Sequence, residues 1–370
     1  MSLARSLRAA LAGVLALALP AFAGEPPLGE AKMSTANKAA AKVLKARMQE
    51  ERPDDYAVLQ QVEAAEVVVV SGEYDRVQDV LREVGVPHVV VTPMRLARTP
   101  LNAKQLLIIN CAGTLGPQGI EKVRKFVNAG GFLYTTDWAL TRVVEKAFPG
   151  FIAFNGRETA DDVVEVQVKE GSGSNLLKHL HLANANPKWW LEGSSYPIRV
   201  LQPDKVEVLV ESREMKKKYG AAPVAVLFRY GDGKVLHIAS HFYLQRNQLR
   251  SVAEAKKGGA YLKEDAKLSK KAAEALADDE DVKNAQAGDI QSAYAAQQMT
   301  SNLVIERKKD QARIDQLYGN TLAAPVASAP GRSAGMATGT RVKVVEKKEG
   351  KVKVRSMEGD EVWVDSAAVK

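Results

Sequence analysis

Cysteine is nearly absent from this chain: among its 370 residues, Cys111 is the only one. A chain with one cysteine forms no internal disulfide, which excludes the small disulfide-stapled folds of many secreted proteins. The fold must therefore rest on its own hydrophobic core. Hydrophobic residues make up 46% of the sequence, which is enough for a sizeable core.

Long apolar runs and phosphate-binding motifs are also missing. No segment after the N-terminus approaches the ~20 apolar residues of a membrane-spanning helix, so we expect no transmembrane segment in the mature chain. Gly113 and Gly116 lack the Gly-x-Gly-x-x-Gly and Walker spacings, which argues against a nucleotide, and we predict no cofactor. The net charge of +8 is a modest excess, which argues against nucleic acid as a partner.

Residues 1–23 have the pattern of a secretory signal peptide. Arg5 and Arg8 form a basic start, an apolar stretch follows, and Ala21-Phe22-Ala23 is a small-x-small cleavage site. An uncleaved anchor is the alternative, but the apolar stretch is short for one. We therefore expect a periplasmic or secreted protein. Residues 24–62, polar and rich in alanine and lysine, are predicted to be a leader that docks weakly or not at all.

The segment from Lys104 to Leu140 predicts the fold class. Two apolar runs, Leu106–Ile109 and Phe132–Thr135, flank a helix-period segment, as in two parallel strands joined by one helix. Similar strands are expected at Glu66–Ser71 and Val86–Val91, and such alternation is typical of a doubly wound, flavodoxin-like α/β sheet. Later strands, joined at the Gly231-Asp232-Gly233 turn, should pair antiparallel and make the sheet mixed.

Composition divides the rest of the chain. We expect residues 63–319 to form the α/β domain, with 249–292 as a charged, solvent-exposed helical insertion that is partly mobile. Residues 320–338 have the alanine, proline and glycine content of a linker. Residues 339–370 predict three short strands at a spacing typical of a small β barrel.

Polar residues follow several of the predicted strands, at the edge where open α/β sheets bind ligands. Asp137 and His241 could form a general acid/base pair, and two or three such groups could hold a metal, although we assign no metal site. The alternative is a degenerate pocket in which Asp137 caps a helix. Cys111 is either a nucleophile with a base in reach or a small buried hydrophobe. The candidate ligand-binding residues are Glu73, Asn110, Thr136, Asp137, Trp138 and His241.

Two aromatic residues, Trp189 and Trp190, lie near Tyr196 and could stack on a sugar. Aromatic residues beside proline turns more often fill the edge of a core, and that alternative stays open.

The C-terminal segment resembles the second part of a bacterial Src-homology-3-like domain. The resemblance rests on Gly339-Thr340, Val342–Val344, Val352–Val354, Gly359 and Trp363-Val364, in the family's order. The family's first strand is absent. Because such domains in exported proteins often bind peptides or cell wall, the resemblance implies a possible cell-wall peptide ligand.

Residues 63–245 resemble the class I glutamine-amidotransferase-like superfamily, nearest to its trehalose-utilisation-type branch. The resemblance lies in the order of elements and in the Gly231–Val235 hairpin, which is followed by a strand leading to His241. Active members use a cysteine on a strand-to-helix elbow, a histidine after a later strand and an acidic partner. Here Thr136-Asp137-Trp138 occupies the elbow, and Cys111 ends the preceding strand.

The resemblance therefore implies a degraded active site. The leading hypothesis is an exported, non-catalytic binding or scaffolding protein of the bacterial cell envelope, with a small-molecule, glycan or cell-wall peptide ligand. The alternative is a hydrolase that uses Asp137 and His241 on a carbohydrate-like or small polar substrate. The distance between these two side chains, and whether Cys111 or Glu73 lies beside them, separates the two hypotheses.

Overall fold

The computed structural model describes residues 28–169, 175–180, 188–241, 255–327 and 335–370, and of residues 28–33 only the backbone. The predicted signal peptide, residues 1–23, lies outside these ranges. Within the described ranges, every helix is too short or too polar to cross a membrane.

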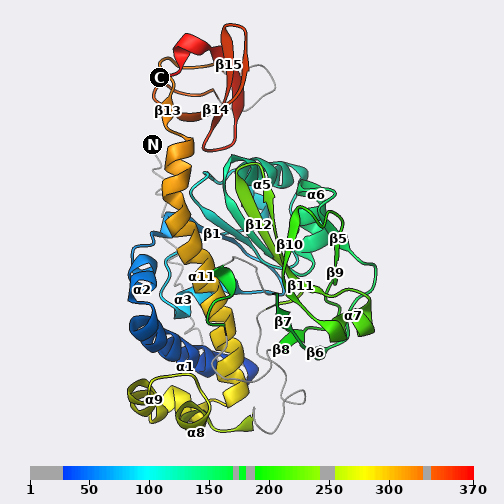
Figure 1. Ribbon diagram of the computed structural model, residues 1–370, viewed down its shortest axis with the longest axis vertical. Coiled ribbons are helices and arrows are strands. Elements are labelled where there is room, and N and C mark those ends of the chain that lie inside the picture. Colours follow the sequence, from blue (N-terminus) through cyan, green and yellow to red (C-terminus); the bar gives the residue numbers. More distant parts are fainter. Residues whose placement is uncertain (1–27, 170–174, 181–187, 242–254, 328–334) are drawn as a thin grey trace, which may run out of the picture.

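An eight-stranded mixed sheet forms the centre of the protein (Figure 1). Its order is β2 (Val89–Val91), β1 (Val67–Val70), β3 (Leu106–Ile109), β4 (Phe132–Thr136), β12 (Gly233–Ile238), β11 (Pro223–Tyr230), β10 (Val206–Glu211) and β7 (Gln167–Val168). The first five strands pair in parallel, and the last three pair antiparallel. The predicted α/β class with a mixed sheet is confirmed, and Gly231 makes the predicted β11–β12 turn at a φ of 58°.

Helices cover both faces of this sheet, which is why β1, β3 and β4 are buried along their whole length. On one face α5 (Pro117–Ala129) packs its apolar side against β4 and β12. On the other face α3 (Val77–Glu83) and the long α11 (Ala287–Leu317) pack together, and α11 reaches β3 (Figure 1). The predicted closing helix at Ala293–Tyr318 corresponds to α11, which starts six residues earlier than expected.

The remaining small elements lie outside the central sheet. Two further pairs of strands, β5 (Ile152–Phe154) with β9 (Ile198–Val200) and β6 (Asp162–Glu165) with β8 (Lys188–Leu191), lie outside it. The short helical segments are η1 (Ala64–Glu66), α4 (Pro93–Leu96), η2 (Leu140–Val144), α6 (Glu145–Ala147), η3 (Asn175–Leu177), α7 (Arg213–Tyr219) and η6 (Ser366–Ala368).

The weakly docked leader predicted for residues 24–62 was wrong for its described part. Residues 28–62 form α1 (Leu28–Glu51) and α2 (Pro53–Gln60), and α1 packs along α11. Ala39, Ala40 and Val43 are fully buried in the main core. Alanine-sized side chains let the two helices approach closely, so a helix that is polar overall still buries one face.

The solvent-exposed insertion predicted at 249–292 also differs from the structure. Its described part forms α8 (Gly258–Glu264), α9 (Lys270–Ala277), α10 (Glu280–Asn284) and the start of α11, and it packs on α1. Tyr261 and Val282 belong to the main core. A Cβ at Gly258 would lie 2.2 Å from the Val282 carbonyl oxygen, so this glycine permits close packing at the start of α8.

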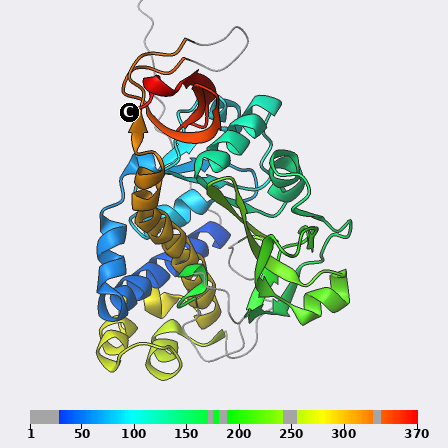
Figure 2. The same ribbon diagram turned by 45° about the horizontal axis from the view of Figure 1, so that its top comes forward.

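A four-stranded antiparallel sheet forms the C-terminal domain (Figure 2). Its strands are β13 (Asn320–Thr321), β14 (Arg341–Lys348), β15 (Lys351–Ser356) and β16 (Glu361–Asp365). Leu322 and Met336, from the predicted linker 320–338, are buried in its small core. The linker therefore supplies part of the domain instead of only preceding it.

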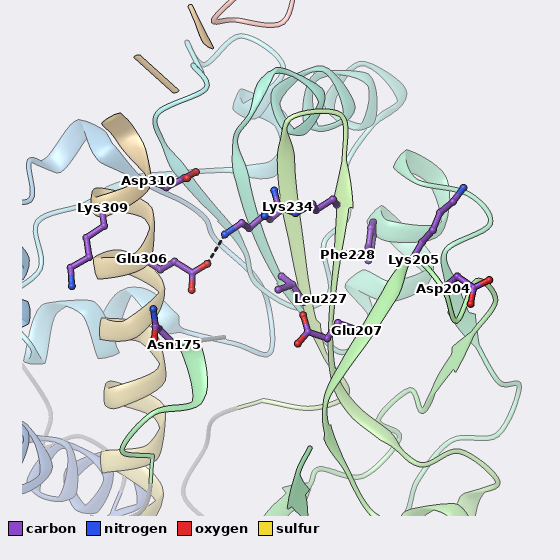
Figure 3. Close-up of a pocket in the computed structure, with 11 residues that line it drawn as sticks. Asn175, Asp204, Lys205, Glu207, Leu227, Phe228, Lys234, Glu306, Lys309 and Asp310 are labelled. Carbon is purple, nitrogen blue, oxygen red and sulfur yellow. Dashed lines mark hydrogen bonds and ion pairs between the residues drawn. The ribbon is translucent and has the colours of Figure 1, made fainter. Parts of the chain in front are cut away.

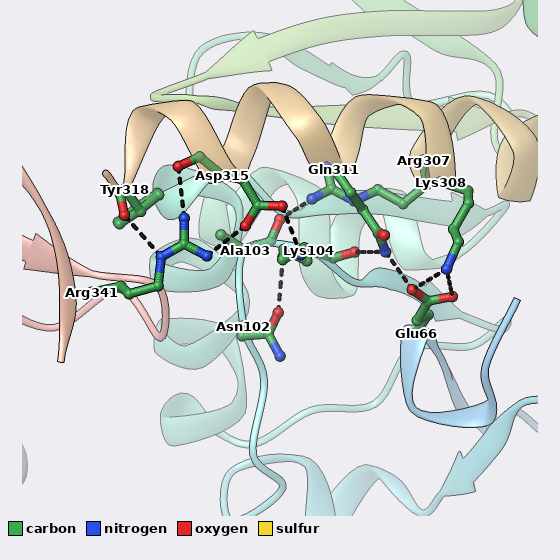
Figure 4. A network of polar contacts seen from close by, with 10 residues as sticks. All are labelled: Glu66, Asn102, Ala103, Lys104, Arg307, Lys308, Gln311, Asp315, Tyr318 and Arg341. Carbon is green, nitrogen blue, oxygen red and sulfur yellow. Dashed lines mark hydrogen bonds and ion pairs between the residues drawn. The ribbon is translucent and has the colours of Figure 1, made fainter. Parts of the chain in front are cut away.

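The C-terminal domain is docked rather than loosely tethered. Arg341 makes an ion pair of 2.5 Å with Asp315 of α11, and it donates to the Tyr318 carbonyl at 3.0 Å. The same row of polar contacts continues along α11 through Lys104 to Glu66, at the start of the sheet (Figure 4). The Ala103 N–H also donates to the Met357 carbonyl at 2.7 Å.

Candidate functional site

The loops that follow β1, β3, β4 and β12 meet at the carboxyl ends of these parallel strands. They bring Cys111, Asp137 and His241 together, with one potential ligand atom of each lying within 4.8 Å of the others. Their exposed fractions are 0%, 3% and 5%. We call these three residues the crest cluster. Asn110 lies in the loop after β3 and Thr136 ends β4 beside it, and both side chains are fully buried.

Cys111 reaches the cluster although its strand precedes the elbow strand in sequence. β3 and β4 are neighbours, with Ile109 opposite Thr135, so their carboxyl ends lie side by side. The Cys111 N–H donates to the Thr136 hydroxyl at 3.1 Å, and that hydroxyl donates to Asp75 at 2.7 Å. These contacts hold the cysteine in a fixed position beside His241.

His241 lies between two acidic side chains. Its Nδ1 is 2.6 Å from Glu192 Oε2, and its Nε2 is 3.7 Å from Asp137 Oδ2. The Glu192 side chain is one-third exposed, so it connects the buried histidine to the surface. The arrangement orients the imidazole, with one nitrogen toward Glu192 and the other toward the cluster.

Asp137 occupies the elbow after β4 with a positive φ of 45°. Its Oδ1 accepts the Tyr196 N–H at 2.7 Å, and Ser195 Oγ lies 3.5 Å from its Oδ2. The following helical turn, η2, begins without a side-chain cap, so the capping alternative for Asp137 is not observed. The aspartate instead ties the elbow to the loop 192–196.

Burial and mutual charge shift the protonation of these groups. Burial raises the pKa of Asp137 to about 7, against the attraction of His241. Burial also raises the pKa of the Cys111 thiol. For His241, burial alone would lower the pKa, but hydrogen bonds with Cys111 and Glu192 and the charges of Asp75 and Asp137 hold it well above its ordinary value. At neutral pH the site therefore contains a thiol and an imidazolium, not a thiolate and a free base.

Two acidic residues of the site escaped sequence reasoning, and one predicted residue does not join it. Asp75 is buried next to Thr136, and Glu192 comes from the segment after β8, a strand outside the main sheet. Glu73 is exposed and contributes only its backbone N–H, which donates to the Cys111 carbonyl at 2.9 Å. The sequence prediction that came nearest to Asp75 was Glu73, two positions earlier in the chain.

An aromatic ledge borders the crest cluster. Trp138 packs edge-on against Tyr74 at 5.1 Å and lies 5.8 Å from Tyr196, which stacks on Phe154 at 4.1 Å. Tyr74 is 48% exposed. We call Tyr74, Trp138, Tyr196 and Phe154 the aromatic ledge. The sequence predicted Trp138 as a ligand contact but did not associate it with Tyr74.

The tryptophan pair expected beside Tyr196 lies apart from the ledge contacts. Trp189 is buried, and Trp190 donates its indole N–H to Asp161 at 2.7 Å. Trp189 thus follows the alternative of core packing, whereas the half-buried Trp190 is outside the core.

A pocket of about 820 Å³ lies elsewhere, between α11 and strands β10–β12 (Figure 3). Its walls carry charges of both signs, including the Lys234–Glu306 ion pair of 2.7 Å, over the apolar Leu227 and Phe228. The predicted site residues are not among its lining residues. The pocket is thus separate from the crest cluster.

No family model and no curated protein matches this chain. Solved structures do match in part. A protein described as a GMP synthase subunit, from Thermoplasma acidophilum, is 11% identical over 68% of this chain and 96% of its own, with a TM-score of 0.40. A ThuA-like protein from Bacteroides uniformis is 12% identical over 49% of this chain and 83% of its own, with a TM-score of 0.36.

A β-galactosidase from Rahnella sp. R3 is 17% identical over 48% of this chain, with a TM-score of 0.36, and only 29% of the galactosidase is covered. The fold itself is established by the observed sheet order. The trehalose-utilisation branch and the Src-homology-3-like tail stay predictions.

Proposed function

We propose that this protein is an exported, non-catalytic ligand-binding protein of the bacterial cell envelope. It binds a small polar or glycan ligand at the crest of the sheet. The observation that carries the proposal is the aromatic ledge, whose half-exposed Tyr74 stands beside the buried crest cluster. Aromatic faces bind sugar-like rings by stacking, and buried polar groups supply orientation. Export rests on the signal-peptide pattern of residues 1–23.

The hydrogen bonding and protonation of the crest cluster support ligand binding without catalysis. Asp137, in the elbow position where active members of the resembling superfamily place a nucleophile, already accepts the Tyr196 N–H. The neighbouring thiol and imidazole both hold their protons at neutral pH, since the pKa of each is raised. A nucleophile and base in these states do not start acyl transfer.

The test is a binding screen of the wild-type protein against oligosaccharides and peptidoglycan fragments, read by tryptophan fluorescence and thermal shift. Tyr74→Ala should weaken binding of any hit about 3- to 10-fold, the size of one aromatic contact. Met94→Ala removes another exposed hydrophobic side chain, 90% exposed in α4, and should leave binding unchanged. Equal affinities of the wild type and Tyr74→Ala would show that the aromatic ledge does not bind the ligand.

A second candidate is a hydrolase for a carbohydrate-like or small polar substrate, in which Asp137 and His241 work as acid and base. The 2.6 Å contact that orients His241 through Glu192 favours it, because a positioned, protonated histidine is a frequent general acid, with the Asp137 carboxylate as the base. Turnover of any glycoside or ester that His241→Gln abolishes, with thermal stability retained, would establish this candidate and exclude pure binding.

A further inference from the structure

The crest cluster has the donor set of a metal site. A sulfur, an imidazole nitrogen and a carboxylate oxygen come from three separate loops, and all three side chains are buried. Thiolate, imidazole and carboxylate are the ligands of zinc in proteins, usually in tetrahedral geometry. A buried carboxylate beside a histidine can be explained as an ion pair. An ion pair does not require the third buried group, the Cys111 thiol, whereas a metal site does.

The spacing within the cluster also fits. Asp137 Oδ2 and His241 Nε2 are 3.7 Å apart, which is too long for a hydrogen bond. Two ligands of one tetrahedral zinc ion lie about 3.3–3.7 Å apart, given metal–ligand distances of about 2.0–2.3 Å. The ligand atoms of Cys111, Asp137 and His241 all lie within 4.8 Å of one another. No pair is therefore more than about 1 Å farther apart than two ligands of one zinc ion.

The surroundings hold the three donors in place. Glu192 accepts from Nδ1 of His241 at 2.6 Å, which is the carboxylate contact that commonly fixes the tautomer of a metal-binding histidine. The Tyr196 N–H donates to Oδ1 of Asp137, and the other oxygen of the same carboxylate, Oδ2, faces His241. The Thr136 hydroxyl fixes the Cys111 backbone. Each donor thus has a separate support.

We propose that Cys111, Asp137 and His241 bind a thiophilic divalent cation of the zinc type, with Glu192 as the positioning residue for His241. The inference rests on the proposed binding function and names the inner part of its ligand site. Binding of the ion displaces the thiol proton of Cys111 and the Nε2 proton of His241 to solvent. The resulting thiolate and the Asp137 carboxylate offset the two charges of the ion. Three protein ligands leave one tetrahedral position, which can take a polar group of a ligand stacked on the aromatic ledge.

Cobalt(II) absorption on the full-length, chelator-treated protein tests the site. Because Cys111 is the only cysteine, a sulfur-to-cobalt charge-transfer band can arise only from this residue. We expect one equivalent of cobalt to give that band, together with the intense visible bands of a four-coordinate ion. Zinc should then remove both by displacement. Cys111→Ser should lose the charge-transfer band, and Glu192→Gln should keep it with about 10- to 100-fold weaker affinity.

His88→Gln, remote from the cluster, is the control and should bind cobalt like the wild type. Absence of the charge-transfer band in the wild-type protein would overturn the metal site, whatever the behaviour of the variants. Unchanged zinc affinity in both Cys111→Ser and His241→Gln would overturn it as well. Hydrolysis by the metal-loaded protein would instead overturn the non-catalytic function and leave the metal site standing.

Discussion

The Nδ1 of His237 in β12 and the hydroxyl of Thr135 in β4 lie 2.9 Å apart on neighbouring strands, with neither side chain exposed. Burial lowers the pKa of His237 to about 3. The folded protein therefore holds this imidazole neutral, while the unfolded chain protonates it near its ordinary pKa of ~6.5. His237 is thus a pH-sensitive part of the core.

Stability should fall as the solution is acidified from about pH 6.5 to about pH 3, because the unfolded state then binds a proton that the folded state does not. The contribution of His237 is about 2–3 kcal/mol by pH 4.5, at about 1.4 kcal/mol per pH unit. Urea unfolding at several pH values should show a shallower acid loss for His237→Gln than for wild type. His88→Gln is the control, and a parallel loss in all three proteins would contradict the prediction.

Gly72 should not tolerate a side chain. A Cβ at this position would lie 2.0 Å from the Cys111 carbonyl oxygen and 2.7 Å from the Cβ of Asn110. Gly72→Ala must therefore push two loops of the crest apart, and we expect a loss of about 1–3 kcal/mol in the free energy of unfolding. Chemical denaturation measures it. Gly319→Ala, whose new Cβ meets its nearest atom at 3.4 Å, should cost much less.

Asp232 should anchor the C-terminal domain. It accepts Lys343 Nζ at 2.7 Å and lies 3.3 Å from the Arg355 guanidinium, and its side chain is only 18% exposed. Asp232→Asn should lower the free energy of unfolding by about 1–3 kcal/mol, the range of hydrogen bonds to charged groups. Thermal unfolding measures the loss, which should shrink in high salt. Asp365→Asn, at an exposed position of the same domain, should change little; equal losses would argue against the anchor.

The sheet could be predicted because its strands are continuous apolar runs. Val67–Val70 and Leu106–Ile109 are buried on both sides, and a run with this composition has few other places in a globular fold. Helix α1 could not be predicted to dock. Its burial depends on the fit of Ala39 and Ala40 to α11, about 250 residues away in sequence, and its own pattern is that of a polar helix.

The site was predicted in part for a similar reason. Asp137 and His241 follow parallel strands, so topology alone brings them to one edge. Cys111 was placed one strand too early for its role in the resembling family, yet adjacent parallel strands end side by side and the thiol reaches the histidine. Glu192 follows a strand outside the sheet, so its approach to His241 is set by tertiary packing that no local pattern records.

The C-terminal domain docks at the end of the sheet opposite the crest cluster. Besides its contacts with α11, it contacts Ala103, Asn128 and Asp232, which all precede strands of the sheet, whereas the crest cluster lies where the strands end. The proposed ligand site at the crest and the C-terminal domain therefore lie at opposite ends of the parallel strands. A ligand bound at the crest would thus leave the C-terminal domain uncovered.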